Sequence, residues 1–400
     1  MTGSATTRVF LHVGTPKTGT TYLQDLLWRN RRELGRRGVC YPGKYRESHF
    51  LAAMDLQGAS VEEVGDLAPI LPFAWDRLVA KVAAARGTVV VSHELFSPME
   101  PDRIERALEA FGGAELHVVC TVRDLARQLP AVWQEDLKNR HTLSFAEFID
   151  AVRDPEQGHW LGELFWRMQD VPDVLRRWAG TLPPQRVHVV TVPPPGSAPE
   201  QLWRRFAAVL GVRPDGLNDS PAEPNRSLAP AEAQLLRRLN LVLPPDLPWW
   251  VYERTVRQEL IDALARRPGG ACRLTLRAEH VPWVSEQAKQ MVTELADAGY
   301  QVVGDLDDLL PTVAPAGPDP DEVSDSEMLD VALDAARDIV ERHGARVAQA
   351  RRPALRQRVR DLGERNAVAR RALALYRSVR HSYQPLRRRG ARSGARQDKA

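Results

Sequence analysis

A short segment near the N-terminus combines glycines, a lysine and threonines in the pattern of an anion cradle. It reads Gly14-Thr15-Pro16-Lys17-Thr18-Gly19-Thr20-Thr21. A glycine-framed turn between a strand and a helix leaves successive backbone N–H groups unpaired and pointing one way, and the helix N-terminus adds partial positive charge. The lysine adds a full cation and the threonines add hydroxyls. These residue types therefore support binding of a phosphate or a similar oxyanion.

The position of the lysine distinguishes this loop from a Walker loop. A Walker loop places Lys immediately after its second glycine. Here Thr20 takes that position, and Lys17 lies two residues before Gly19. The lysine therefore approaches the anion from the loop and not from the first turn of the helix. This difference argues against a nucleoside-triphosphate-dependent kinase, which is the alternative function on the same kind of sheet.

The second half of the loop resembles the 5′-phosphosulfate loop of sulfotransferases that use 3′-phosphoadenosine 5′-phosphosulfate (PAPS). The family pattern is Pro-Lys-Ser/Thr-Gly-Thr-Thr/Ser, and the chain matches it at every position with Pro16, Lys17, Thr18, Gly19, Thr20 and Thr21. The resemblance implies that these residues bind PAPS, that 3′,5′-adenosine bisphosphate (PAP) is the product, and that no metal takes part. It also implies that Lys17 is the catalytic cation on the leaving phosphate.

A second element of the resemblance is an arginine at the end of a strand. In the family, this arginine and a serine eight residues later hold the 3′-phosphate of the donor. The apolar run 116–122 ends in Arg123, whose fork of N–H donors suits phosphate, but the eighth residue onward is Ala131. Arg127 is a candidate auxiliary cation. The resemblance therefore predicts a 3′-phosphate contact at Arg123 whose second partner is altered.

Two further segments extend the resemblance. Residues 128–138 resemble a bacterial, mostly actinobacterial, branch of sulfotransferase-like proteins, and the likeness covers residues 8 to about 240. In the family a late basic loop closes over the adenosine and 3′-phosphate, which makes Arg226 a candidate donor contact. A helix cap formed by Asn225 or Ser227 is the alternative reading of that loop.

Sulfuryl transfer also needs a base for the proton of the acceptor. The apolar run 88–92 leads directly into His93 and Glu94, and sulfotransferases use either residue type as the base. Adjacent residues of an extended segment point to opposite sides, so one of the two faces the donor. Glu94 is favoured by the bacterial resemblance, whereas His93 has the better unperturbed pKa. His49 and Glu135 are outside candidates, for the base or for lining the acceptor pocket.

Hydrophobic patterning predicts the elements that position these residues. Short apolar runs predict buried strands at 8–13, 38–43, 88–92, 116–122 and 187–192. Helical spacing predicts helices at 20–27, 72–85, 101–111, 124–138, 144–152 and 171–179, with Thr20 or a neighbour as the cap of the first. This alternation predicts an α/β fold with a P-loop-like, doubly wound parallel sheet flanked by helices, and ligands at the carboxyl ends of its strands.

Composition changes along the chain predict its domains. We expect a sulfotransferase-like α/β domain over 1–311, with its core at 8–240 and a helical part at 199–311. A Pro- and Asp-rich linker at 312–325 is expected to lead to a helical extension at 326–384 and a basic disordered tail at 385–400.

Charge is distributed unevenly between these parts. The net charge is +3, but residues 346–400 contain 17 Arg and Lys against three acids, so the preceding residues carry −11. The tail is therefore a candidate for binding an anionic membrane surface or for self-association, with a solvated helix as the plainer reading. Arginine runs without interleaved aromatic residues make nucleic acid an unlikely partner.

Other features of the sequence limit the possible location and function of the protein. The first residues lack the pattern of a signal peptide, no run approaches the length of a membrane span, and the three cysteines lack metal-ligand spacing, so a cytoplasmic protein without a metal is expected. The acceptor, whether small molecule, glycan or lipid, is not readable. A catalytically silent scaffold is a third reading, because Ala131 departs from the family pattern.

Overall fold

The structure is a computed structural model that describes residues 6–156, 159–180, 182–219, 227–267, 274–312, 317–350 and 371. The chain divides into two compact units, residues 1–336 and 337–400, which are considered separately. The sheet and the candidate site lie in the first unit. Helix α14 (Asp325–Ala350) runs into the second. The predicted basic tail at 385–400 lies outside the described residues.

Among the described residues, six strands form one sheet in which every pairing is parallel, in the order β2-β3-β1-β4-β5-β6. The strands are β1 (Arg8–His12), β2 (Val39–Cys40), β3 (Thr88–Ser92), β4 (Glu115–Val122), β5 (Val187–Thr191) and β6 (Gln301–Val303). The predicted doubly wound parallel sheet is confirmed, and β6 adds a strand that the patterning does not predict.

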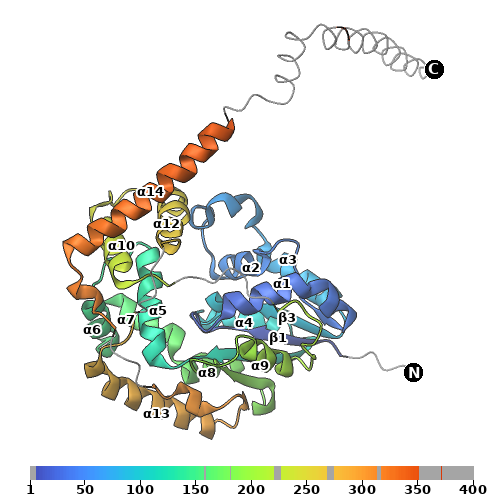
Figure 1. The fold of residues 1–400 in the computed structure, drawn as a ribbon. Helices are drawn as coiled ribbons and strands as arrows, with labels where there is room; N and C mark the ends of the chain where they lie inside the picture. The colour runs from blue at the N-terminus through green and yellow to red at the C-terminus, as the bar shows by residue number, and fades with distance from the viewer. Residues whose placement is uncertain are drawn as a thin grey trace, which may run out of the picture. The chain divides into compact units, whose positions relative to one another are not determined.

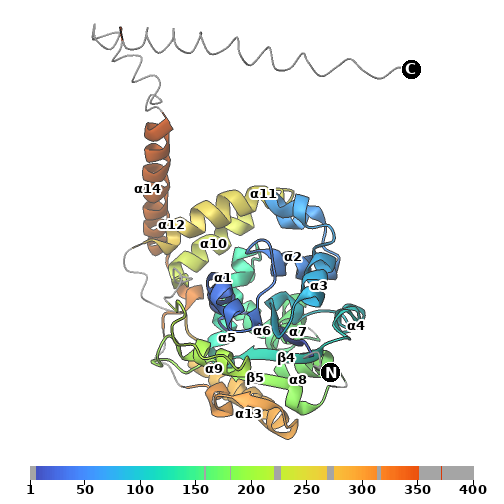
Figure 2. The same cartoon turned by 90° about the vertical axis from the view of Figure 1, so that its right-hand side faces the viewer.

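Helices connect the strands and cover both faces of the sheet. Figure 2 shows α1 and α9 on one side of the sheet and α4 and α8 on the other. The helices of the first unit are α1 (Thr20–Arg36), α2 (Ser48–Gln57), α3 (Ala74–Ala84), α4 (Pro101–Ala110), α5 (Leu125–Lys138), α6 (Phe145–Arg153), α7 (Trp160–Gln169), α8 (Val171–Ala179), α9 (Gln201–Val209), α10 (Pro230–Val242), α11 (Trp249–Tyr252), α12 (Ile261–Ala265) and α13 (Val281–Asp297).

The apolar pattern of β1 and α1 explains why they pack where they do. Val9, Phe10 and Leu11 of β1 are at most 2% exposed, as expected of a strand that is covered on both faces. Helix α1 buries leucines at helical spacing against the same sheet, together with Trp203 and Phe206 of α9. Each such buried side chain contributes about 1.5–3 kcal/mol to the free energy of unfolding. The start of α1, next to the loop, is therefore firmly held.

Strand β4 extends past the end of β1 and runs beside the first residues of the loop. His12, the last residue of β1, pairs with Val119, so β4 continues for three residues past β1. The chain after β1 follows this extension, because Val13 N–H donates to the Val119 carbonyl and Thr15 N–H donates to the Thr121 carbonyl, each at 2.9 Å. The first half of the loop is thereby anchored along β4.

A helical segment from far along the chain covers the carboxyl edge of the sheet. It consists of α10, α11, the π-helical turn η4 (Glu253–Leu260) and α12. Helix α10 packs on α5 (Figure 1). Helix α11, labelled in Figure 2, contacts the 3₁₀ segment η1 (Val61–Ile70). Among the described residues, no helix is long and apolar enough to cross a membrane.

Candidate functional site

The loop after β1 presents a row of unsatisfied backbone donors. Within the described part of the chain, the N–H groups from Lys17 to Thr21 have no hydrogen-bond acceptor. Helix α1 starts after Gly19, whose φ is +85°, and no side chain caps it. The cap expected from Thr20 or a neighbour is therefore absent, and the helix N-terminus is open to an anion. The φ of +85° favours glycine at position 19, and a Cβ there would also force Leu202 Cδ2, which would lie 2.5 Å away, to shift.

A buried hydrogen-bond network holds the loop from below. Thr18 Oγ1 donates to the Thr15 carbonyl at 2.5 Å and lies 2.6 Å from Thr121 Oγ1. His12 lies 3.1 Å from the same Thr121 hydroxyl and 2.8 Å from Ser92 Oγ. Burial lowers the pKa of His12 to about 4, so its ring is neutral at pH 7. The network joins the loop to β3 and β4, and the sequence reasoning missed His12.

Helix α5 holds the opposite side of the loop. Gln128 Nε2 donates to the Pro16 carbonyl at 2.5 Å and to Gln169 Oε1 at 2.8 Å. Gln169, at the end of α7, donates to the same Pro16 carbonyl at 3.3 Å. Two buried amides therefore fix the residue that precedes Lys17. Neither glutamine has a local sequence signal, because their partner is more than 110 residues away.

Lys17 is paired with a carboxylate in this structure. Its backbone has a φ of 64°, and Nζ lies 2.5 Å from Glu135 Oε2 of α5. Glu135 Oε2 is also 3.9 Å from Lys138 Nζ, and its Oε1 is 3.3 Å from Arg257 of the π-helical turn. Burial raises the pKa of Glu135, but Lys17 and the other two cations outweigh it and bring the pKa to about 2. Glu135 is thus a permanent anion and not a base for neutral pH.

The end of β3 borders the loop on its other side. A Cβ on Gly14, whose φ is +110°, would lie 3.2 Å from the Cα of Glu94. Glu94 Oε2 accepts a hydrogen bond from Gln24 at 2.9 Å, and the Thr20 hydroxyl is near enough to lower the pKa of this carboxylate. Burial raises the pKa of Glu94, but His93 and these side chains bring it below its ordinary value. Glu94 therefore lies against the loop as a carboxylate.

His93 lies next to Glu94, with its Nδ1 4.0 Å from Glu94 Oε2. Its Nδ1 accepts the backbone N–H of Leu95 at 3.2 Å, and its ring lies 5.5 Å from that of Phe50. Burial lowers the pKa of His93, against the opposing effect of Glu94. A neutral ring that accepts at Nδ1 carries its proton on Nε2, so it has no lone pair left for a substrate proton. The expectation that only one of the two residues faces the donor stays a prediction.

A cavity of about 170 Å³ opens beside these two residues. It is lined by Thr21, Gln24, Asp25, Tyr41, Arg46, Glu47, His49, Phe50 and His93. His49 is fixed within this wall, because one ring nitrogen lies 2.5 Å from the Pro42 carbonyl and the other accepts the Ser92 N–H at 3.1 Å. Burial lowers the pKa of His49 to about 4. The cavity lies between the loop helix and α2, and two neighbours of Glu94, Gln24 and His93, are among its lining residues.

Arg123 follows β4 and is only partly satisfied. Its Nη2 donates to the Arg127 carbonyl at 2.7 Å, while its Nε is buried without a hydrogen-bond partner. Burial and then Arg127 lower the pKa of Arg123 to about 10, so it stays charged at pH 7. Arg127 itself is engaged with Asp124 and with the Pro193 carbonyl. An unpaired buried guanidinium atom is a group that an anion would satisfy.

The sequence analysis also assigned roles near the donor to Arg226 and to the position of Ala131. Arg226 lies outside the described residues, and so does the loop around it. Ala131 is a half-buried residue of α5. The predicted role of each stays a prediction.

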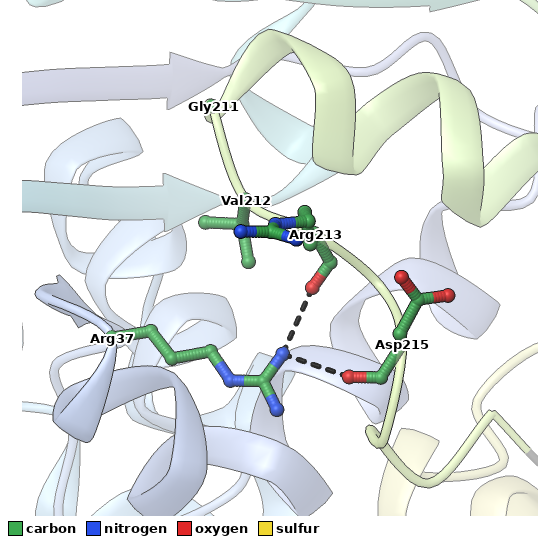
Figure 3. A pocket seen from close by; sticks show the side chains of 5 residues that line it. All are labelled: Arg37, Gly211, Val212, Arg213 and Asp215. Atoms are coloured by element: carbon green, nitrogen blue, oxygen red, sulfur yellow. Dashed lines mark hydrogen bonds between the residues drawn. The ribbon is translucent and has the colours of Figure 1, made fainter.

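A second hollow lies away from the loop. It measures about 460 Å³ and is lined by Arg37, Gly211, Val212, Arg213 and Asp215 (Figure 3). Arg37 follows the C-terminus of α1, a helix of 17 residues that is about 25 Å long. Its guanidinium donates to the carbonyls of Arg213 and Asp215 and pairs with Glu33. This arginine is engaged with the protein itself, so the hollow offers little to an anion.

The fold and the loop together define a parallel α/β protein with a glycine-framed loop before α1 and an arginine at the next strand end. Two solved structures are similar to this chain. The crystal structure of a sulfotransferase from Alicyclobacillus acidocaldarius is 20% identical with a TM-score of 0.37, and the match covers 54% of this chain and 86% of that one. A sulfotransferase domain from the curacin biosynthetic pathway is 13% identical with a TM-score of 0.31, covering 55% and 78%.

No protein-family model matches the chain, and no curated protein matches it significantly. Likenesses with TM-scores below 0.5 carry no argument about activity. The function therefore has to be argued from the loop and its neighbours.

Proposed function

We propose that this chain is a PAPS-dependent sulfotransferase that transfers the sulfuryl group of PAPS to a hydroxyl or amine of an acceptor. The observation that carries the proposal is the loop. Residues 16–21 match the 5′-phosphosulfate pattern, and the N–H groups from Lys17 to Thr21 have no acceptor within the described part of the chain. Five donors and an ammonium at an uncapped helix N-terminus are suited to one phosphate group.

Arg123 supports a donor with a second phosphate. It lies at the end of β4, which neighbours β1, and its buried Nε lacks a partner. Planar N–H donation by arginine is suited to phosphate oxygens. A nucleotide with phosphates at its 5′ and 3′ positions would satisfy the loop and Arg123 together.

The chain's own residues can support the transfer step. The acceptor atom bonds to sulfur as the bond from sulfur to the phosphate oxygen breaks, and the acceptor loses a proton. Glu94 lies against the loop as a carboxylate, next to Gln24 and His93 of the cavity wall, so it is the base in this proposal. Lys17 stabilises the negative charge that develops on the phosphate of PAP. His93 lines the acceptor cavity and does not take the proton, because its Nδ1 lone pair is occupied.

One observation favours a nucleotide-dependent kinase as a second candidate. The Thr20 hydroxyl, at the first residue of α1, is near enough to the Glu94 carboxylate to lower its pKa. A hydroxyl and a carboxylate beside a phosphate loop are also the ligands by which nucleoside-triphosphate enzymes hold Mg²⁺. The lysine position and the engagement of Asp124 with Arg127 argue against that candidate.

Isothermal titration separates the two candidates. We expect the purified protein to bind PAP more tightly than ATP with Mg²⁺, and tighter binding of ATP would refute the proposal. An acceptor screen with ³⁵S-labelled PAPS against lysate lipids, glycans and small molecules then tests turnover. A Lys17→Ala variant that equals the wild type in binding and turnover would instead support the silent scaffold.

A further inference from the structure

The lysine of the donor loop is neutralised by a carboxylate of the same protein. Lys17 and Glu135 are each about 30% exposed, at 30% and 28%, and their charged atoms are 2.5 Å apart. An anionic ligand that uses the Lys17 ammonium has to compete with this carboxylate. The free site therefore differs in charge from the site that binds a donor.

Glu135 can release Lys17 without becoming an isolated charge. Its Oε2 also faces Lys138 Nζ at 3.9 Å, and its Oε1 faces Arg257 at 3.3 Å. A half-buried carboxylate that lost its only partner would be strongly destabilised, but two cations remain here. Lys138 and Arg257 also lower the pKa of Glu135, so they favour its ionised form after Lys17 has left.

Arg257 is held in place for this contact. Its Nη1 donates to Asn139 Oδ1, the C-cap of α5, at 2.9 Å, and its Nε pairs with Glu253 at 3.3 Å. Its guanidinium also lies 5.9 Å from the ring of Trp249. The residue stands on the π-helical turn η4, and such turns occur frequently at functional sites. The π-helical turn is thus linked to Lys17 of the donor loop through Glu135.

From these contacts we infer that Glu135 and Arg257 are positioning residues that set the affinity of the loop for a nucleotide. Glu135 holds Lys17 in the free protein and passes to Arg257 and Lys138 when a phosphate of the nucleotide takes the lysine. Arg257 favours the bound arrangement because it stabilises Glu135 away from Lys17. The inference rests on the proposed function for the identity of the nucleotide, PAP or PAPS, but the exchange of partners does not depend on the transfer step.

Changes of opposite sign in the Kd of PAP would distinguish this role from a purely structural one. Glu135→Gln removes the competitor, so we expect the Kd of PAP to fall about fivefold. Arg257→Gln leaves Glu135 more dependent on Lys17, so the Kd is expected to rise about threefold. If both residues were only supports, both substitutions would weaken binding.

A double variant tests whether Arg257 acts through Glu135. In the Glu135→Gln background, Arg257→Gln is expected to change the Kd by less than about twofold, which is a coupling between the two positions. Matched controls are Arg254→Gln, an exposed arginine of the same π-helical turn, and Glu163→Gln, an exposed glutamate of α7. They change the net charge equally and should leave the Kd within about twofold.

The measurement is isothermal titration at about 0.15 M salt, with circular dichroism to show that each variant is folded. A Kd that rises in Glu135→Gln, or an Arg257→Gln effect that persists in the double variant, would overturn the inference. The wild-type titration reports separately on the proposed function. If ATP binds and PAP does not, the variants are compared with ATP, and a chain that binds neither nucleotide refutes both ideas.

Discussion

Two glutamates flank the donor loop, and their surroundings differ in kind. Glu94 comes from the end of β3 and accepts a hydrogen bond from the neutral amide of Gln24. Glu135 comes from α5 and is surrounded by the cations Lys17, Lys138 and Arg257. A carboxylate beside a neutral donor is better suited to accept a proton than one among three cations. In the proposed function this difference in environment makes Glu94 the base and Glu135 a positioning residue.

The comparison is tested most strongly by matched amide substitutions. Glu94→Gln should lower kcat by a factor of about 10² to 10⁴, the usual range for a general base, and leave the Kd of PAP unchanged. Glu135→Gln should leave turnover within about an order of magnitude. Turnover with ³⁵S-PAPS in excess, together with titration of PAP, gives both quantities. Equal losses of kcat in the two variants would remove the distinction, and His93→Asn is the control that should retain activity.

Asp136, the residue after Glu135, has a raised pKa, whereas the pKa of Glu135 is lowered. Burial and then the charge of Glu135 raise the pKa of Asp136 to about 7. A carboxyl group whose pKa is higher when folded contributes stability below its unfolded pKa, near 3.9, and that contribution is lost as the pH rises through about 7.

Asp136→Asn should therefore match the wild type at pH 4 and exceed it at pH 8 by on the order of 3 kcal/mol in the free energy of unfolding. Urea unfolding at both pH values measures this difference. A gain that is equal at pH 4 and pH 8 would show that Asp136 is ionised throughout, as Glu135 is.

A substitution at Arg123 tests nucleotide binding separately from the transfer step at the loop. Arg123→Gln removes the buried guanidinium whose Nε lacks a partner, so the Kd of PAP should rise about 30-fold, a loss near the 1.5–3 kcal/mol of a hydrogen bond to a charged group. The kcat with saturating donor should change little, because both glutamates are unaffected. A variant that keeps its PAP affinity would place the second phosphate elsewhere.

The smallest expected effect comes from adding a hydroxyl. Ala131 is a half-buried residue of α5, at the position where the family resemblance has a serine. Ala131→Ser should lower the Kd of PAP by about fivefold, since a net hydrogen bond contributes about 1 kcal/mol. Adenosine 5′-phosphosulfate, which lacks the 3′-phosphate, is the control ligand and should gain nothing. A gain shared by both ligands would contradict a 3′-phosphate contact there.

Local patterns predicted most of the sheet and half of the site. β3 was predicted without error and β1, β4 and β5 to within one residue, because each is a short apolar run between polar turns. β6 has three residues and none is fully buried, so it leaves no comparable pattern. Helices α2 and α7 were also not predicted.

The candidate site likewise has residues that local sequence patterns indicate and others that they do not. The loop, Arg123 and the His93–Glu94 pair follow strand ends and could be read locally. The partners of the loop could not: Glu135 is 118 residues from Lys17, and Arg257 is 122 residues from Glu135. Only packing of α5 and the π-helical turn brings them together. His12 had a weak local signal, as a histidine that ends an apolar strand directly before the loop.

The network beneath the loop has a consequence for protein engineering. Thr18 reaches Thr121, which reaches His12, and His12 reaches Ser92, so the loop is tied to three adjacent strands at one level of the sheet. A transplant of residues 16–21 into another parallel sheet would carry the hexapeptide but not these supports. The motif is thus portable only together with a histidine before the loop, a serine on one neighbouring strand and a threonine on the other.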